Sequence, residues 1–273
     1  MSTVKTVADS NYIHGEDATA QQVYNQRTVE QDAALLVPHL RPGMRLVDFG
    51  CGAGSITCGL ARLLAPGEVL GFDMSEGAIE RARALAEEAG LDNVRFSVAD
   101  LNELELPTAS FDVAQFSRVL MHLREPQRAM QLAFSSLKPG GMLAACEAYG
   151  SGNWTLGPNA ESIMLFLRVL QEENNTNRTG PDQLIGGRLV GLFREAGFIR
   201  LESKPCYSAV LSDSKAVAAL VQAGWSDTFR QILIRHGINA QRCDQLLEEI
   251  LIWAESEDSV AAFAECAVIG WKP

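Results

Sequence analysis

The amino-acid sequence predicts an α/β fold: a doubly wound sheet of seven strands, the last of them antiparallel, with helical cap insertions. Short β-rich runs alternate with helical patterns from about residue 45 to residue 148, which is typical of a parallel sheet covered by crossover helices. Three glycines at alternate positions follow the first apolar run, at the edge where such sheets bind ligands. Two late apolar runs joined by helical stretches fit a sheet whose last pair of strands is antiparallel.

The core elements are bounded by recognisable stop and cap residues. Pro66 and Gly67 end the first helical pattern, Ser75 is a suitable N-cap for the second, and Gly90 is a suitable C-terminal stop. The turn "KPGG" precedes the fifth strand. We expect strands at 45–49, 68–73, 93–100, 111–117 and 141–149, and helices at 55–67, 76–90 and 126–137.

After Tyr149 the alternation stops. A loop, an amphipathic helix and an Asn-rich loop follow, and they predict a cap laid over the sheet. A helix at 187–197 and a strand at 198–210 then return to the sheet pattern. We expect a single domain over 1–273, with an N-terminal helical lid at 1–40, a cofactor-binding core at 41–150, cap insertions at 151–182 and 212–256, and a C-terminal strand at 260–272.

Charge and composition narrow the class of partner. The formal net charge is −11, so a general attraction to phosphate backbones or anionic lipid is absent. The N-terminal stretch has no apolar core of a signal peptide, and no run approaches the roughly 20 apolar residues that span a bilayer. We therefore expect a cytoplasmic protein that acts on a small molecule and binds neither nucleic acid nor membrane, with a homodimer left open.

The six cysteines are widely scattered, with no CxxC pair and no close histidine. A zinc site is not indicated by this spacing, and buried free thiols in a reducing compartment are the expectation. No metal is expected.

The glycine-rich turn "DFGCGAG" at 48–54 is the strongest motif. A triphosphate loop requires GxxxxGK[ST], and this segment contains no lysine. The dinucleotide fingerprint requires a glycine where Ser55 stands, and it leaves Asp48 unexplained. Of the three ligands known to bind such glycine turns, a nucleoside triphosphate, a dinucleotide and S-adenosylmethionine, only S-adenosylmethionine is left as a candidate.

Five motifs in order resemble the class I S-adenosylmethionine-dependent methyltransferases, which have a Rossmann-like fold. These are "DFGCGAG", "GFDMS", "VADLN", "FSRVLMHL" and "LKPGGML". The fourth and fifth are similar to segments of the ubiquinone and menaquinone methyltransferases, a small-molecule group. The resemblance covers 40–148 well, the N-terminal helix loosely and the segment after 150 hardly at all.

The resemblance implies the cofactor-binding residues. Asp73 would accept hydrogen bonds from both ribose hydroxyls, which suits an ionised carboxylate with two acceptor oxygens. Asp100 would receive the adenine amino group, and Asp48 would help to fix the ammonium group. Three structural alternatives stay open: Asp48 as a brace of the turn, Asp73 as a strand-end cap and Asp100 as a helix N-cap. The other implied contacts are the turn residues Gly50, Cys51, Gly52 and Gly54 and, around the adenine, Met74, Ala99 and Leu101.

Further candidates lie around the transferred methyl group. Ser117 and Arg118 follow the fourth strand; Arg118 would pair either with the cofactor carboxylate or with a surface acid. His122 is the candidate general base, with a purely structural role as its alternative. Tyr24 and Gln26 match residues that face the methionine moiety in the related group, and packing of the leading helix is their alternative.

Acceptor-binding residues are expected in the cap. The candidates are Trp154, Met164, Phe166 and Arg168, with packing inside the cap as the alternative. The resemblance implies in-line methyl transfer to a small organic acceptor, quinone-like or a natural product, in which the protein supplies mainly orientation and exclusion of water. A protein methyltransferase and a cofactor-binding protein with a non-methylating activity are the alternatives.

Overall fold

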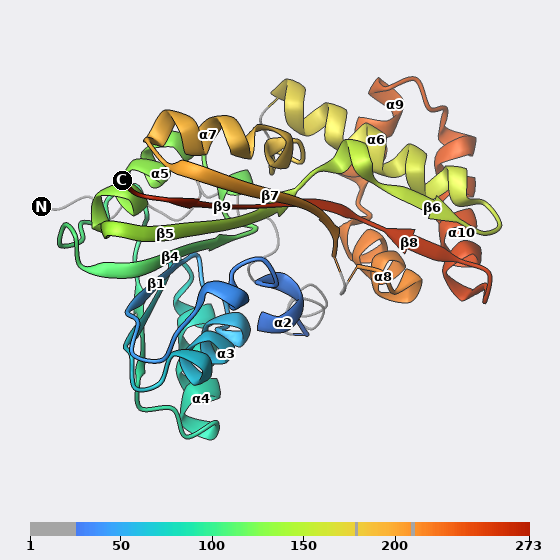
Figure 1. The fold of residues 1–273 in the computed structure, drawn as a ribbon. Helices are drawn as coiled ribbons and strands as arrows, with labels where there is room; N and C mark the ends of the chain where they lie inside the picture. The colour runs from blue at the N-terminus through green and yellow to red at the C-terminus, as the bar shows by residue number, and fades with distance from the viewer. Residues whose placement is uncertain (1–25, 178–179, 209–210) are drawn as a thin grey trace, which may run out of the picture.

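The computed structural model describes residues 26–177, 180–208 and 211–273. Its main sheet has seven strands in the order β3-β2-β1-β4-β5-β9-β7, and the chain reverses its direction of winding between β1 and β4 (Figure 1). β9 pairs antiparallel with both β5 and β7, whereas the other neighbouring strands pair in parallel. The predicted seven-stranded sheet with an antiparallel last strand is confirmed.

The first half of the chain builds five parallel strands and the helices that cross between them. Helix α3 leaves the sheet directly after the glycine turn, and α4 is capped by Ser75, whose hydroxyl accepts a hydrogen bond from Ala78 N–H. The elements are β1 Leu46–Phe49, α3 Ser55–Leu64, β2 Val69–Asp73, α4 Glu76–Glu88, β3 Val94–Val98, β4 Phe111–Ser117, the 3-10 helix η2 Leu120–His122, α5 Pro126–Ser136 and β5 Leu137–Ala148.

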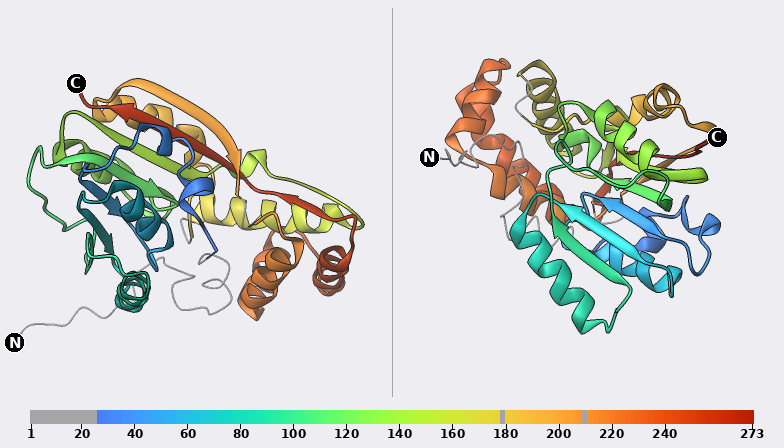
Figure 2. Two further views of the ribbon diagram at one scale, coloured as in Figure 1. Left: turned by 60° about the horizontal axis from the view of Figure 1, so that its bottom comes forward. Right: turned by 90° about the vertical axis from the view of Figure 1, so that its left-hand side faces the viewer.

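The second half alternates between the sheet and the cap. The returning elements of the sheet are α7 Leu189–Ala196, β7 Ile199–Tyr207 and β9 Ala264–Trp271. The cap contains α6 Ala160–Asn177, α8 Ser214–Gly224, α9 Asp227–Arg235, α10 Ala240–Glu255 and a small sheet of β6 Trp154–Leu156 with β8 Val260–Ala262. Figures 1 and 2 show these cap elements gathered beyond one end of the main sheet.

Three boundaries differ from the sequence prediction. β5 begins at Leu137 and contains "KPGG", and the pairing with β4 shifts register between Phe111 and Val113 to accommodate it. The expected strand at 260–272 divides into β8 and β9, which belong to different sheets. Within the described part of the expected N-terminal lid, the helical segments are only α2 Val29–Asp32 and the 3-10 helix η1 Val37–His39.

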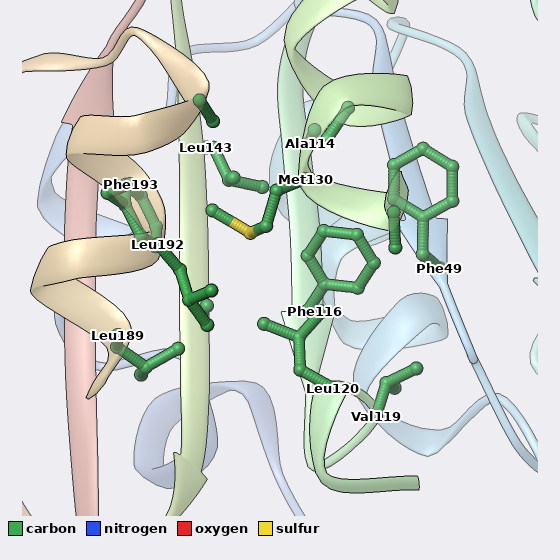
Figure 3. Close-up of a cluster of buried hydrophobic side chains, with 14 of the residues drawn as sticks. Phe49, Ala114, Phe116, Val119, Leu120, Met130, Leu143, Leu189, Leu192 and Phe193 are labelled. Carbon is green, nitrogen blue, oxygen red and sulfur yellow. The ribbon is translucent and has the colours of Figure 1, made fainter. Parts of the chain in front are cut away.

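The main core lies on both faces of the sheet. On one face, α5 and α7 pack over β4 and β5, and Figure 3 shows Met130 of α5 among Phe116, Leu120 and Leu143. On the other face, α2 and α3 pack over β1 and β4 through Val29, Leu36 and Leu60, among others. The sheet is therefore covered on both faces, and its strands end at the edge where a ligand would bind.

The cap has a hydrophobic core of its own. Its buried residues come from α6, α8, α9, α10 and β8, together with Leu211 just before α8, and Trp253 is fully buried among them. In the part of the chain that the structure describes, no helix has the length and apolar character needed to cross a membrane.

Candidate functional site

The glycine turn lies at the carboxyl end of β1, next to the point where the strand order reverses. The backbone N–H groups of Gly50 and Cys51 both donate to the carbonyl of Phe72 in β2, at 2.7 and 3.0 Å. Gly50 has φ of +72°, and a Cβ there would lie 2.4 Å from a methyl carbon of Val119. Gly52 has φ of +54°, and no described atom lies within 4 Å of where its Cβ would be. Gly50 is thus required by packing, whereas Gly52 leaves open space beside the turn.

Asp73 at the end of β2 connects the turn to the second helix. Its Oδ2 accepts a hydrogen bond from Gly52 N–H and its Oδ1 accepts one from Ser75 N–H, both at 2.9 Å. A carboxylate oxygen can accept two hydrogen bonds, so each oxygen retains a place for a second donor. Asp73 is 6% exposed, and this burial raises the pKa of its carboxyl group. Paired acceptor oxygens fixed by backbone donors suit a vicinal diol.

Asp48 lies beneath the turn, in the interior. Its Oδ2 accepts a hydrogen bond of 2.7 Å from the hydroxyl of Thr57 in α3. Burial raises the pKa of Asp48 to about 7, although Thr57 and the positive charge of Arg27 act in the opposite direction. Asp48 does brace the turn and helix, through a side chain rather than through backbone N–H groups. A cation that approached from the turn would favour its ionised form.

Arg27 contacts the predicted site residue Ser117, and the sequence motifs did not single it out. Its Nη2 donates to the Ser117 hydroxyl at 2.7 Å, and its Nε donates to Asp32 Oδ1 at 2.7 Å. The side chain is 9% exposed and fixes the N-terminal segment against the end of β4. Its only signal in the sequence is that no other lysine or arginine occurs between Lys5 and Arg41. Gln26, its neighbour, is exposed, and Tyr24 lies outside the described residues.

The segment after β4 is held in a strained conformation by a buried carboxylate. Arg118 has φ of +59°, which is uncommon for a residue with a side chain. Glu147 Oε1 accepts hydrogen bonds from the N–H groups of Val119 and Leu120, both at 2.8 Å, and Oε2 accepts one from Met121 at 3.3 Å. Complete burial raises the pKa of Glu147 to about 7. Glu147 therefore fixes the first turn of η2, and sequence reasoning did not identify it.

Two candidates on this segment have defined partners. Arg118 pairs with Glu265 at 3.0 Å and donates to the Ser208 hydroxyl at 3.3 Å. Arg118 therefore pairs with an acid of the chain, as its alternative role supposed. This acid is buried and not on the surface, since 12% of the Arg118 side chain and 4% of the Glu265 side chain are exposed. His122 is half-buried at the end of η2, and its backbone N–H donates to the carbonyl of Val119.

The ends of β2 and β3 present an apolar surface to solvent. Met74 and Val98 are each 49% exposed, whereas Leu101 is buried in the main core. Asp100 is exposed, and its Oδ1 accepts a hydrogen bond of 2.8 Å from Asn102 N–H. Asp100 thus stabilises a turn, and no helix begins directly after it in the described chain, so the helix N-cap alternative is wrong. Ala99 is anchored through its N–H to the carbonyl of Asp73. Met74 and Val98 are thus available to cover an aromatic ring.

The acceptor candidates of the cap have different environments. Trp154 is 41% exposed and packs edge-on against Tyr207, to whose hydroxyl its Nε1 donates at 3.2 Å. Met164 is half-buried and Arg168 is exposed on α6. Phe166 is buried in the cap core against Trp225 and Phe229, so it fills the packing role.

Comparison with known proteins relates this geometry to a family. A family model described as a methyltransferase domain matches residues 40–197. The chain is 26% identical over 283 residues to "Probable methyltransferase ltbC" of Aspergillus luteorubrus, a match that covers 96% of this chain and 98% of that protein. It is also 29% identical over 175 residues to the ubiquinone/menaquinone biosynthesis C-methyltransferase UbiE of Vibrio campbellii, covering 58% of this chain and 65% of UbiE.

A solved structure has the same fold. The crystal structure of a "putative methyltransferase" from Bacillus halodurans superposes with a TM-score of 0.60 at 15% sequence identity. The match covers 88% of this chain and 97% of the other.

Proposed function

This chain belongs to the S-adenosylmethionine-dependent methyltransferases, and we propose that it methylates a small organic molecule, quinone-like or a natural product, by in-line displacement. The observation that carries the proposal is the pair of acceptor oxygens on Asp73, fixed by Gly52 and Ser75 next to the open side of the glycine turn.

The residues present fit the family's cofactor. Asp73 would hold the ribose hydroxyls, and the exposed side chains of Met74 and Val98 would cover the two faces of the adenine. The carboxylate of Asp48 would hold the ammonium group of the cofactor, and the guanidinium of Arg27 would hold its carboxylate group, because each carries the opposite charge. When bound, S-adenosylmethionine supplies an electrophilic methyl group on a sulfonium.

The chain's own contribution to the transfer is position and exclusion of water. Glu147 fixes the backbone of Val119, Leu120 and Met121 beside the turn, so the wall facing the acceptor does not need to reorganise. Orientation of two reactants can supply roughly 7 to 11 kcal/mol of a barrier. The strained backbone at Arg118 is consistent with a wall fixed for function.

His122 is the group that we propose to accept a proton from the acceptor. It lies on η2, which Glu147 caps, and an imidazole can take up a proton near neutral pH. An acceptor hydroxyl or amine loses a proton as the new bond to the methyl carbon forms, and His122 would receive it. A carbon acceptor would lose its proton to the same base after the transfer.

The cap would enclose the acceptor. The exposed aromatic pair of Trp154 and Tyr207 offers apolar faces with a hydroxyl group between them, which suits a ring compound that carries polar substituents. A negative net charge of −11 also disfavours a polyanionic acceptor. Both features support a small neutral acceptor over RNA.

Two measurements test the proposal. Calorimetry should show that the chain binds S-adenosylhomocysteine, that Asp73→Ala weakens binding at least tenfold and that Asp92→Ala, at an exposed position on another loop, leaves binding unchanged. Turnover with methyl-labelled S-adenosylmethionine should then place the label on quinols or phenolic natural products. Label on a peptide panel alone would favour protein methylation, and binding without any transfer to either panel would contradict the proposal.

A further inference from the structure

Three strands bring two thiols and a carboxylate to one point on the face of the sheet. Cys146 of β5, Cys206 of β7 and Glu265 of β9 have ligand atoms that all lie within 4.8 Å of one another. The two Sγ atoms are 3.9 Å apart, and the Cys146 thiol lies 3.5 Å from Glu265 Oε2. Cys146 and Glu265 are 5% and 4% exposed, and Cys206 is half-buried.

The backbone geometry argues against a disulfide as the purpose of this pair. β9 lies between β5 and β7, so the two cysteines are separated by two strand spacings. Cys146 pairs with Ala267 of β9 and Cys206 pairs with Glu265, so the two cysteines are also offset by two residues along the strands. In a regular sheet with strands about 4.8 Å apart, such a diagonal pair exceeds the Cα separation of roughly 4.4–6.8 Å found in ordinary disulfides. Ala267 of β9 pairs with Cys146 on one side and with Lys204 on the other. Because its side chain is small, it does not block the approach of the two sulfur atoms across β9. A third atom between the sulfur atoms fits this spacing better than a bond.

The separations match those of ligands around a tetrahedral metal ion. A Zn–S distance of about 2.3 Å places two sulfur ligands about 3.8 Å apart, and a sulfur and a carboxylate oxygen about 3.6 Å apart. The Sγ–Sγ distance of 3.9 Å and the distance of 3.5 Å from Cys146 Sγ to Glu265 Oε2 agree with these values, and the ligand atoms of the third pair, Cys206 and Glu265, lie within 4.8 Å of each other. Two thiolates and a carboxylate carry three negative charges, and the Arg118 guanidinium, 3.0 Å from Glu265 Oε1, offsets one of them. A divalent cation would balance the remaining charge.

The open side of the cluster faces a cleft between the sheet and the segment 31–36. The cleft is small, with a volume of about 50 Å³, and Cys146, Cys206 and Gln115 are among its lining residues. Gln115 is 2% exposed, and neither of its amide atoms has a hydrogen-bond partner among the described residues. It lies on β4 beside Ala144, two residue pairs before the pairing of Ser117 with Cys146. An unpaired buried amide at this place indicates that a polar group, such as a metal-bound water, belongs in the cleft.

We propose that Cys146, Cys206 and Glu265 bind one Zn²⁺ ion, with its fourth position directed into the cleft beside Gln115. Arg118 holds the second oxygen of Glu265 and so orients that ligand. All three ligands lie where the chain passes between the sheet and the cap: just before Ala148, just before Tyr207 and at the start of β9. The ion would therefore fasten three strands together at the base of the cap.

Cobalt is a suitable probe because thiolate-bound Co²⁺ absorbs in the near ultraviolet and its visible bands report tetrahedral geometry. The reduced, chelator-treated full chain is titrated with Co²⁺ without oxygen, then with Zn²⁺ as competitor. We expect one Co²⁺ per chain, displacement by Zn²⁺ and protection of two thiols from a thiol reagent. Cys146→Ser and Cys206→Ser should each weaken binding more than tenfold, whereas Cys266→Ser, next to Glu265 but on the opposite face of β9, should bind as the parent does.

The controls keep metal binding separate from folding and from the cofactor. Cys206 is the half-buried ligand, so Cys206→Ser is the variant expected to fold most readily, and circular dichroism checks each variant. Binding of S-adenosylhomocysteine by the metal-free chain is measured in parallel, because it tests the proposed function without the ion. Absence of a cobalt–thiolate band, an unchanged band in both ligand variants, or an equal loss in Cys266→Ser would overturn the zinc site.

Discussion

The hydroxyl of Ser117 accepts a hydrogen bond of 2.7 Å from Arg27, which joins the N-terminal segment to the end of β4. The same guanidinium pairs with Asp32 and lies close enough to Asp48 to lower the pKa of that carboxyl group. A planar guanidinium has five N–H donors, so these two contacts leave donors for a ligand carboxylate. Arg27 is therefore our candidate for binding the cofactor carboxylate.

Arg27→Met should raise the Kd for S-adenosylmethionine ten- to a hundredfold, which is about 1.4 to 2.8 kcal/mol. The reason is the loss of the donors to the cofactor carboxylate and of the anchor on Ser117. Calorimetry measures the change, and Arg41→Met, at an exposed position in the same segment, is the matched control. A change of less than twofold would remove Arg27 from the cofactor site.

Binding of the cofactor should depend on pH through Asp48. Burial raises the pKa of Asp48 to about 7, so below that pH the carboxyl group is protonated and cannot pair with an ammonium group. We expect the affinity for S-adenosylhomocysteine to rise by up to tenfold per pH unit from pH 5.5 to about 7 and then to level off. Calorimetry in buffers of different ionisation enthalpy measures the released proton. Asp48→Asn should bind weakly with a flatter pH dependence, and an unchanged slope in that variant would assign the effect to another group.

The ligand-free protein should lose stability as the pH rises toward neutrality. Burial disfavours the charged form of Glu147 and raises its pKa from the ordinary value of 4.5 to about 7 in the folded chain. The folded state therefore holds a proton that the unfolded state releases between these values, and the free energy of unfolding should fall by up to about 1.4 kcal/mol per pH unit for this group. Urea unfolding at pH 5.5 and 7.5 checks the trend. Glu147→Gln should lessen the fall, and an equal fall in the variant would contradict this assignment.

The two glycines of the turn should respond differently to alanine. Gly50→Ala places a methyl group 2.4 Å from Val119 at a positive φ, so it should destabilise the fold by about 1–3 kcal/mol. Gly52→Ala meets open space and should cost only the strain of its φ, about 1–2 kcal/mol, but the methyl group would occupy the ligand's side of the turn.

Gly43→Ala is the matched control for Gly52→Ala, because Gly43 also has a positive φ and open space around it but lies before β1. Thermal melting and calorimetry on both variants separate strain from ligand exclusion. We expect Gly43→Ala to keep its affinity for S-adenosylhomocysteine and Gly52→Ala to lose at least tenfold. Equal affinities in the two variants would place the ligand elsewhere.

Trp154 should affect the acceptor and not the cofactor. Trp154→Ala removes the exposed indole that packs on Tyr207, so the KM for the acceptor should rise about tenfold while the Kd for S-adenosylhomocysteine stays the same. Ile252→Ala, at another exposed apolar position in the cap, on α10, serves as the control. Parallel changes in both kinetic constants and cofactor affinity would show a general effect on the cap instead.

Much of the core could be predicted because its determinants are local in the sequence. The glycine turn, Ser75 as a helix cap and the apolar runs of the strands each act within a few residues of themselves, and the structure contains all of them. Arg27, Glu147 and the cluster around Cys146 depend on partners 90, 28 and 60 residues away, respectively. The local sequence around each residue does not predict these partners, because only the topology of the sheet brings them close together. The cap helices were expected, but their separate core depends on contacts between α6 and three later helices.

The separate hydrophobic core of the cap affects which parts of the chain can change in sequence independently of each other. Its buried cluster runs from Ile163 to Ala261 and shares no residue with the clusters beneath and above the main sheet. We therefore expect replacements inside the cap core to change the packing of the cap while leaving the packing of the main sheet unchanged. The cap comes from two separate stretches of the chain, one before α7 and one after β7, so a chimera with a new cap would have to exchange both stretches and keep α7 and β7 in the main sheet.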